Sequence, residues 1–193
     1  MATEIERKFA ATDAQQEQIR SDHPGSWETI AMQTTYYDTP DGALSQRRWT
    51  LRLRLENGTP IYTFKTPEVD GIRGEWDCQC DTIEKAVAEL CKLDCPKELA
   101  SLARQGLIPI CGARFTRQAL TLAAEGCTLE LALDRGVLMG GSREEALCEI
   151  EAELKSGSEE ALDAFAAQLA SRYGLKTQPK SKFRRALALA KGE

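Results

Sequence analysis

Charged side chains alternate with apolar or small ones near both ends of the chain, and this period of two favours β-strands with one charged face. The acidic members of the pattern are Glu4, Glu6, Glu149, Glu151 and Glu153. Because carboxylates on one strand face repel each other, the pattern favours a cation or a partner of opposite charge among them. Carboxylate oxygens are the ligands that Mg²⁺ and Mn²⁺ prefer. The sequence therefore predicts a metal site; for either segment alone, a strand with a solvated polar face is the alternative.

The middle of the chain carries the opposite charge in the same format. Arg52 and Arg54 alternate with leucines, and Lys65 lies on the next apolar segment. A third segment places Arg73 and Glu75 on one face. Mg²⁺ usually keeps few protein carboxylates and is completed by substrate phosphates, whose oxygens match the guanidinium fork of arginine. If these carboxylates and guanidinium groups face one cavity, the protein binds a polyanion together with a metal.

The order of these motifs resembles that of the CYTH superfamily, the triphosphate tunnel metalloenzymes. The start Glu4-x-Glu6-x-Lys8 is similar to the ExExK signature of that family, and the likeness extends to about Ala188. The other matching segments are Tyr36-Tyr37-Asp38-Thr39-Pro40, Leu51-Arg52-Leu53-Arg54, Thr63-Phe64-Lys65, Arg73-Gly74-Glu75, Arg117, Leu133-Asp134, Glu149-Ile150-Glu151-Ala152-Glu153 and Pro179-Lys180-Ser181-Lys182. Within the family, the chain is most similar to bacterial inorganic triphosphatases, notably over residues 148–157.

The resemblance implies an α+β fold: an antiparallel eight-stranded β-barrel, or tunnel, with a polar interior and flanking helices, in a single domain over residues 1–193. Because charged side chains point inward, the hydrophobic core must lie between the outer face of the barrel and the helices. Alternation and turn signals place strands near residues 4–9, 27–37, 50–55, 60–66, 72–80, 111–122, 127–134 and 147–154. Helical periodicity and capping residues place helices over 13–20, 82–105 with a break at Cys95-Pro96, 158–173 and 181–190.

The resemblance also implies roles for individual residues. One or two Mg²⁺ or Mn²⁺ ions would be held by Glu4, Glu6, Glu149, Glu151 and Glu153. The triphosphate would be clamped by Lys8, Arg52, Arg54, Lys65, Arg73, Arg117 and Lys182. Lys65 and Tyr36 would form a catalytic pair that orients the terminal phosphate or the attacking water. Glu75, Glu130 and Asp134 would contact and orient these residues without contacting the metal or the triphosphate themselves. Lys182 would close the tunnel from the C-terminal helix, with a solvated helix face as its alternative, and Arg184 and Arg185 are expected to be solvated.

Composition limits the other possibilities. The only histidine, His23, lies in a Pro-Gly turn, so histidine-based catalysis and metal binding are not expected. The net charge of −5 argues against non-specific binding to nucleic acid. No apolar run approaches the roughly 20 residues that span a bilayer, and the charged N-terminus does not resemble a signal peptide, so a cytoplasmic protein is expected. The seven cysteines lack paired zinc spacing and are expected to be buried, reduced thiols.

Three functions compete. The leading prediction is metal-dependent hydrolysis of inorganic tripolyphosphate to pyrophosphate and phosphate, by a monomer or homodimer. The second is a thiamine or nucleoside triphosphatase or a class IV adenylate cyclase, for which the chain shows no clear base-recognition motif. The third is a non-enzymatic module that binds polyphosphate, although the complete set of acidic residues favours retained metal chemistry. A Glu151→Gln variant is expected to lose turnover and keep the fold, because it removes one of several like charges.

Overall fold

Alternating side chains build nine antiparallel strands in the computed structural model, which describes residues 5–69 and 72–193. The strands are β1 (Glu6–Ala10), β2 (Glu28–Asp38), β3 (Thr50–Glu56), β4 (Thr59–Val69), β5 (Ile72–Cys78), β6 (Ile108–Ala124), β7 (Cys127–Gly140), β8 (Arg143–Gly157) and β9 (Lys176–Thr177). The helices are α1 (Asp13–Asp22), α2 (Ala43–Gln46), α3 (Ile83–Lys92), α4 (Glu98–Ala103), α5 (Glu159–Tyr173) and α6 (Lys182–Lys191). None of these described helices is both long and apolar enough to cross a membrane.

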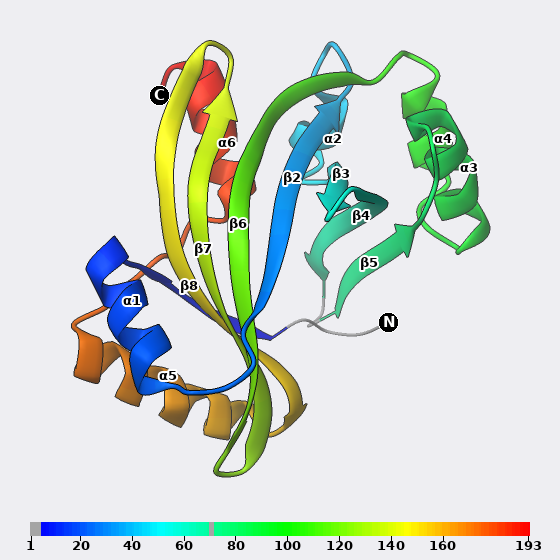
Figure 1. Ribbon diagram of the computed structural model, residues 1–193. Coiled ribbons are helices and arrows are strands. Elements are labelled where there is room, and N and C mark those ends of the chain that lie inside the picture. Colours follow the sequence, from blue (N-terminus) through cyan, green and yellow to red (C-terminus); the bar gives the residue numbers. More distant parts are fainter. Residues whose placement is uncertain (1–4, 70–71) are drawn as a thin grey trace.

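The strands form one curved sheet in the order β5-β4-β3-β2-β6-β7-β8-β1-β9, and the long strands β6, β7 and β8 make up its largest wall (Figure 1). The predicted antiparallel barrel is confirmed, with two differences. The sheet has nine strands rather than eight, because β9 adds two residues beside β1, too few to leave a pattern in the sequence. Among the described residues no ladder joins β5 to β9, so backbone hydrogen bonds do not close the barrel.

Most of the hydrophobic core lies on the outer face of the sheet, as predicted from the polar interior. One cluster joins Ile150 of β8 to Leu162 of α5, and α1 and α5 cover this part of the sheet. A second cluster joins Leu51 of β3 and Phe64 of β4 to Leu90 of α3. Burying one such side chain stabilises the fold by about 1.5–3 kcal/mol. These apolar clusters therefore hold the helices against the outer face of the sheet.

Helix α6 packs on the inner face of the sheet, a position that the sequence did not predict. Its Ala186 is fully buried in a third apolar cluster with Leu138 of β7 and Leu147 of β8. Side chains two or four residues apart share a strand face, so Asp134 and Glu149 lie on this same inner face. The apolar side of α6 therefore fills part of the barrel interior, and its N-terminal end faces the charged side chains.

Strands β7 and β8 continue well beyond the predicted ranges 127–134 and 147–154. The connecting sequence contains Gly136 and Gly140, which resemble loop signals, but both allow close backbone approach instead. A Cβ atom at Gly136 would lie 2.1 Å from the carbonyl oxygen of Arg114 on β6. A Cβ atom at Gly140 would lie 2.4 Å from the carbonyl oxygen of Ala186 on α6. The two glycines therefore let β7 approach both its neighbour β6 and the inner helix α6 closely.

Capping residues fix the ends of the helices on the outer face. The side chain of Ser158 accepts a hydrogen bond from the first turn of α5, and Gly174 ends that helix with a φ of 63°, as predicted. Helix α1 begins differently, because its cap is Thr12 rather than Asp13. Thr12 and Gln15 form a reciprocal capping box, which satisfies the backbone N–H groups of both residues.

The position of the core predicts the cost of removing one buried side chain. Leu162 is fully buried between α5 and the sheet, so Leu162→Ala should lower the free energy of unfolding by about 2–5 kcal/mol. Leu93 is 49% exposed, so Leu93→Ala should change it by less than about 0.5 kcal/mol. Urea unfolding of both variants measures the difference. Equal losses would contradict a core on the outer face.

Candidate metal and anion site

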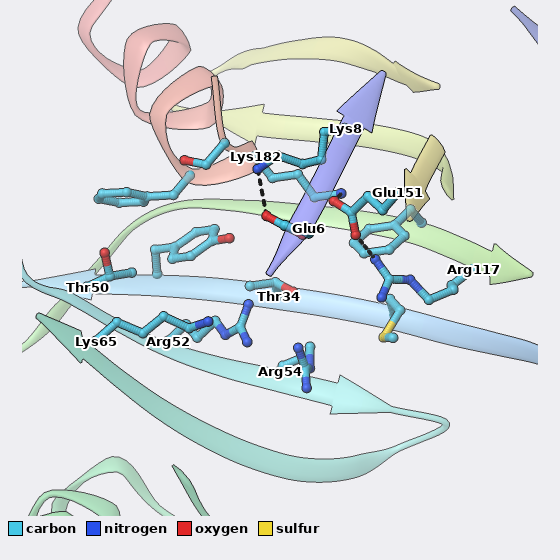
Figure 2. Close-up of a pocket in the computed structure, with 15 residues that line it drawn as sticks. Glu6, Lys8, Thr34, Thr50, Arg52, Arg54, Lys65, Arg117, Glu151 and Lys182 are labelled. Atoms are coloured by element: carbon cyan, nitrogen blue, oxygen red, sulfur yellow. Dashed lines mark hydrogen bonds and ion pairs between the residues drawn. The ribbon is translucent and has the colours of Figure 1, made fainter. Parts of the chain in front are cut away.

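A polar cavity of about 160 Å³ lies on the inner face of the barrel (Figure 2). The predicted site residues that line it are Glu6, Lys8, Tyr36, Arg52, Arg54, Lys65, Arg117, Glu151 and Lys182. Figure 2 shows the basic side chains of β3 and β4 along one side of the cavity, with Glu6 and Glu151 across from them. Strands far apart in the sequence thus bring predicted anion-binding and metal-binding residues into one space.

Three carboxylates converge next to the cavity, and one of them, Glu151, lines it. Asp134 lies on β7 and is the direct cross-strand partner of Glu149 on β8, and Glu151 follows two residues later. One oxygen from each lies within 4.8 Å of the others, and this is the one acidic cluster of three or more found in residues 5–69 and 72–193. The side chains of Asp134 and Glu149 are 0% and 1% exposed. Burial of this kind requires compensating positive charge.

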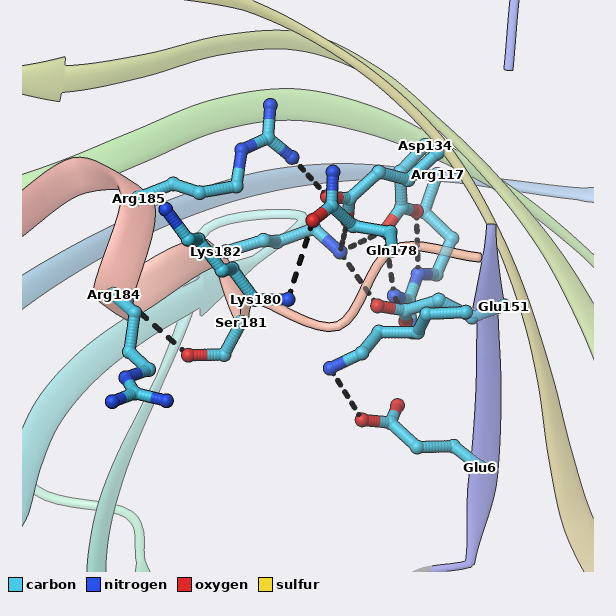
Figure 3. Close-up of polar contacts among 12 residues, drawn as sticks. Glu6, Arg117, Asp134, Glu151, Gln178, Lys180, Ser181, Lys182, Arg184 and Arg185 are labelled. Carbon is cyan, nitrogen blue, oxygen red and sulfur yellow. Dashed lines mark hydrogen bonds and ion pairs between the residues drawn. The ribbon is translucent and has the colours of Figure 1, made fainter. Parts of the chain in front are cut away.

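The compensating charge comes from β6 and from the first turn of α6 (Figure 3). The Nζ atom of Lys182 lies 2.8 Å from Asp134 Oδ2, 2.8 Å from Glu149 Oε2 and 2.7 Å from Glu151 Oε1. Arg117 donates two parallel hydrogen bonds of 2.8 Å to the carboxylate of Asp134 and also contacts Glu151. Arg185 pairs with Glu149. Three cations therefore surround three carboxylates.

These contacts set the protonation states of Glu151 and Lys182. Burial alone would raise the pKa of Glu151, but the charges of Lys182 and Arg117 outweigh it and hold this pKa at about 2. Burial would lower the pKa of Lys182, but Asp134, Glu151 and Glu149 raise it well above its ordinary value. Glu151 is therefore an ionised carboxylate, ready to act as a ligand, throughout the neutral range.

The opposite wall of the cavity is positively charged and incompletely paired. The Nε atoms of Arg52 and Arg54 are buried, and neither has a hydrogen-bond partner among the described residues. Burial and the nearby charge of Arg52 lower the pKa of Arg54, whose Nη2 pairs with Glu56 at 2.6 Å. Lys65 pairs with Glu75 at 2.8 Å, so Glu75 orients a lysine. Buried guanidinium donors without partners favour a bound anion.

Tyr36 lies beside this basic wall. It is the cross-strand partner of Arg52, and its ring packs against Phe183 of α6 with centroids 4.8 Å apart. Burial raises the pKa of Tyr36, and the charges of Arg52 and Lys182 offset only part of that rise. Its hydroxyl therefore keeps its proton near neutral pH and can donate a hydrogen bond.

Several predicted residues lie outside the carboxylate cluster. Glu6 lines the cavity and pairs with Lys8 at 2.9 Å, while Glu153 pairs with Lys155 at 2.9 Å. Glu130 lies 3.9 Å from Arg117, and its supporting role stays a prediction. Two predicted residues cannot be placed in the site: Glu4 lies outside the described residues, and so does the side chain of Arg73 on β5.

The prediction of a solvated Arg185 was wrong, since its side chain is 13% exposed and pairs with Glu149 and Glu145. Arg184 is exposed, as predicted. The spacing Lys182-x-x-Arg185 could have distinguished the paired Arg185 from the exposed Arg184, because residues three apart share one face of a helix.

Gln16 of α1 was also missed. Its buried side-chain amide donates to the backbone carbonyl oxygens of Asp134 at 3.0 Å and Glu149 at 2.8 Å. This contact ties the outer helix to the two strands that carry the carboxylates. A single glutamine in a polar helix gives no sequence signal for such a role.

The chain matches the CYTH domain over residues 2–187 and therefore belongs to the CYTH family. It is 30% identical over 144 residues to the inorganic triphosphatase of Haemophilus influenzae, a match that covers 74% of this chain and 41% of that protein. The chain thus spans less than half the length of this relative.

Two solved structures share the fold. One is HpAC1 from Hippeastrum, described as an adenylyl cyclase candidate with dominant triphosphatase activity; it is 19% identical, with a TM-score of 0.70 over 99% of this chain and 97% of that one. The other, from Bacillus halodurans, is described as a candidate adenylate cyclase; it is 20% identical, with a TM-score of 0.63 over 94% of this chain and 96% of that one.

The ion pairs of Glu151 predict a stability loss that the sequence alone did not. Glu151→Gln removes a partner of Lys182 and Arg117, so in chelator it should lower the free energy of unfolding by about 3 kcal/mol, the lower end for a broken buried ion pair. In the exposed pair of Glu89 with Lys92, Glu89→Gln should cost less than about 1 kcal/mol. Urea unfolding in EDTA compares them. A Glu151→Gln protein as stable as the wild type would contradict this and support the sequence-based expectation, in which removing one of several like charges leaves the fold intact.

Proposed function

We propose that the protein hydrolyses inorganic tripolyphosphate to pyrophosphate and phosphate in this cavity, with Mg²⁺ or Mn²⁺ as cofactor. The observation that carries the proposal is the pairing of two opposed walls. Glu151, a member of the convergent carboxylate cluster, lines one side of the cavity, and the unpartnered Nε donors of Arg52 and Arg54 lie on the other. Family membership and the Haemophilus relative agree with chemistry on a triphosphate.

The acidic residues fit a divalent ion. Asp134, Glu149 and Glu151 offer converging carboxylate oxygens, the donor type that Mg²⁺ and Mn²⁺ prefer, and they already surround a positive charge, that of Lys182. Glu6 is proposed as a further ligand because it lines the same cavity. Glu4 and Glu153 stay predictions from the sequence. A bound ion would polarise the phosphoanhydride and make a water molecule more acidic.

The basic residues bind and orient the substrate. Arg52 and Arg54 would clamp phosphate oxygens with the donors they leave unused, and Lys8, Lys65 and Arg117 would balance charge that develops on the phosphates. Arg117 is already held by Asp134, so it would orient a carboxylate ligand as well as meet the substrate. Tyr36 would donate a hydrogen bond to the terminal phosphate or to the attacking water, and Lys65, which lines the same cavity, would act with it.

An organic triphosphate is the second candidate substrate. Met32, Phe115 and Phe183 also line the cavity and give it an apolar side where a thiamine or nucleoside group could pack. A cyclase acting on ATP and a module that binds polyphosphate without turnover are the remaining alternatives. A single domain over residues 1–193, a monomer or homodimer and a cytoplasmic location stay predictions from the sequence.

A substrate panel tests the proposed function. Phosphate release should be measured from tripolyphosphate, ATP, thiamine triphosphate and pyrophosphate, each with Mg²⁺, with Mn²⁺ and with EDTA. We expect metal-dependent release that strongly favours tripolyphosphate. Preference for an organic triphosphate would support the second candidate. Tight binding of tripolyphosphate without release under any metal would support the binding module instead.

The unpartnered Nε donors predict that replacing a single arginine of the basic wall strongly lowers activity. Arg54→Met should lower kcat/KM for tripolyphosphate by about 10- to 100-fold, the range for losing a hydrogen bond to a charged group. Arg114 of β6 is exposed on the other face of the sheet, so Arg114→Met provides a control with the same loss of charge and should keep wild-type kinetics. Steady-state kinetics, with circular dichroism to confirm folding, measure both. Equal kinetics in the two variants would show that Arg54 does not bind the substrate.

A further inference from the structure

The ammonium group of Lys182 occupies an unusual position. It lies 2.7–2.8 Å from one oxygen of each of Asp134, Glu149 and Glu151, the three carboxylates that converge within 4.8 Å. A Mg²⁺ ion bound by these residues would need the same oxygens at about 2.0–2.1 Å. Two positive centres cannot share these oxygens at such distances without strong repulsion. Lys182 and a divalent ion therefore compete for one place.

The position of Lys182 in its helix shows that the carboxylates, and not the helix, hold it there. It is the first residue of α6, and the first turn of this helix contains no acidic residue. Cations at a helix N-terminus oppose the helix dipole, and this turn carries Lys182, Arg184 and Arg185 together. The acidic cluster compensates for this unfavourable arrangement by pairing with Lys182 and Arg185.

The charges also define where Lys182 can go. In the cluster, Asp134, Glu149 and Glu151 are matched by three cations, so a divalent ion added beside all of them would leave an excess of buried positive charge. Lys182 and its neighbours Ser181 and Phe183 line the cavity, across from the basic wall. A triphosphate entering with the ion would bring the negative charge that a displaced ammonium group requires.

We propose that Lys182 is an internal counter-cation of the metal site, whose ammonium group leaves the carboxylates when a divalent ion binds and transfers to the phosphates of the substrate. This inference rests on the proposed function. It gives α6 a specific role. Before the ion binds, the helix keeps the three carboxylates together, and the divalent ion then binds more tightly when a triphosphate is present. The coupling follows from competition at one position and requires no movement of the sheet.

A metal titration without substrate tests the competition. Mn²⁺ binding to the apoprotein, followed by electron paramagnetic resonance, should be about 5- to 100-fold tighter in Lys182→Met than in the wild type, the usual range for coupling between sites. Arg184→Met removes a charge from the same helix turn at an exposed position and should bind Mn²⁺ like the wild type. Mn²⁺ binding that is unchanged or weaker in Lys182→Met would overturn the proposal.

A second measurement uses the wild-type protein, in case Lys182→Met does not fold in chelator. Lysine acetylation by a small activated ester, mapped by mass spectrometry, should leave Lys182 protected in EDTA and modify it when Mg²⁺ is added. A methylene-bridged tripolyphosphate analogue added with Mg²⁺ should protect it again. Protection that Mg²⁺ does not change would overturn the proposal. Phosphate release by the wild type in parallel separates this outcome from failure of the proposed function.

Discussion

The neutralisation of three buried carboxylates is the interaction on which this structure depends. Asp134 and Glu149 are almost completely removed from solvent, and ionised groups in such places cost several kcal/mol each unless cations pair with them. Arg117 supplies one cation from the sheet, and α6 supplies two, from Lys182 and Arg185. Ion pairs at its first turn and apolar contacts along its length thus hold α6 inside the barrel.

The charged interior also decides where the hydrophobic core can be. On β8, Glu149 and Glu151 face inward while Ile150 and Ala152 face the outer cluster beneath α5. A register slip of one residue would exchange these two sets, placing carboxylates in the core and isoleucine in the cavity. The same alternation therefore fixes both the strand register and the positions of the site residues, so fold and site are specified together.

This local alternation is also why much of the fold and of the site could be predicted from the sequence. Strand faces follow from a period of two, and Arg52, Arg54 and Glu151, each placed by that period on a charged strand face, line one cavity. Cross-strand register is not local: β1 pairs Glu6 with Glu153, and among the described residues the convergent cluster joins Glu149 and Glu151 to Asp134.

The same limit applies to residues whose role depends on tertiary packing. Asp134 follows a run of mostly apolar residues on β7, and only the pairing of β7 with β8 shows that it belongs with Glu149 and Glu151.

The two sides of the cavity do not neutralise each other. On the acidic side, the cations are already paired with carboxylates, as Lys182 is with Glu149. On the basic side, Arg52 and Arg54 keep unused donors. A divalent ion alone would displace Lys182 and leave those donors unsatisfied, and an anion alone would face Glu151 and Glu6 across the cavity. A divalent ion together with a polyphosphate satisfies both walls at once, which is the physical basis for a triphosphate as the proposed substrate.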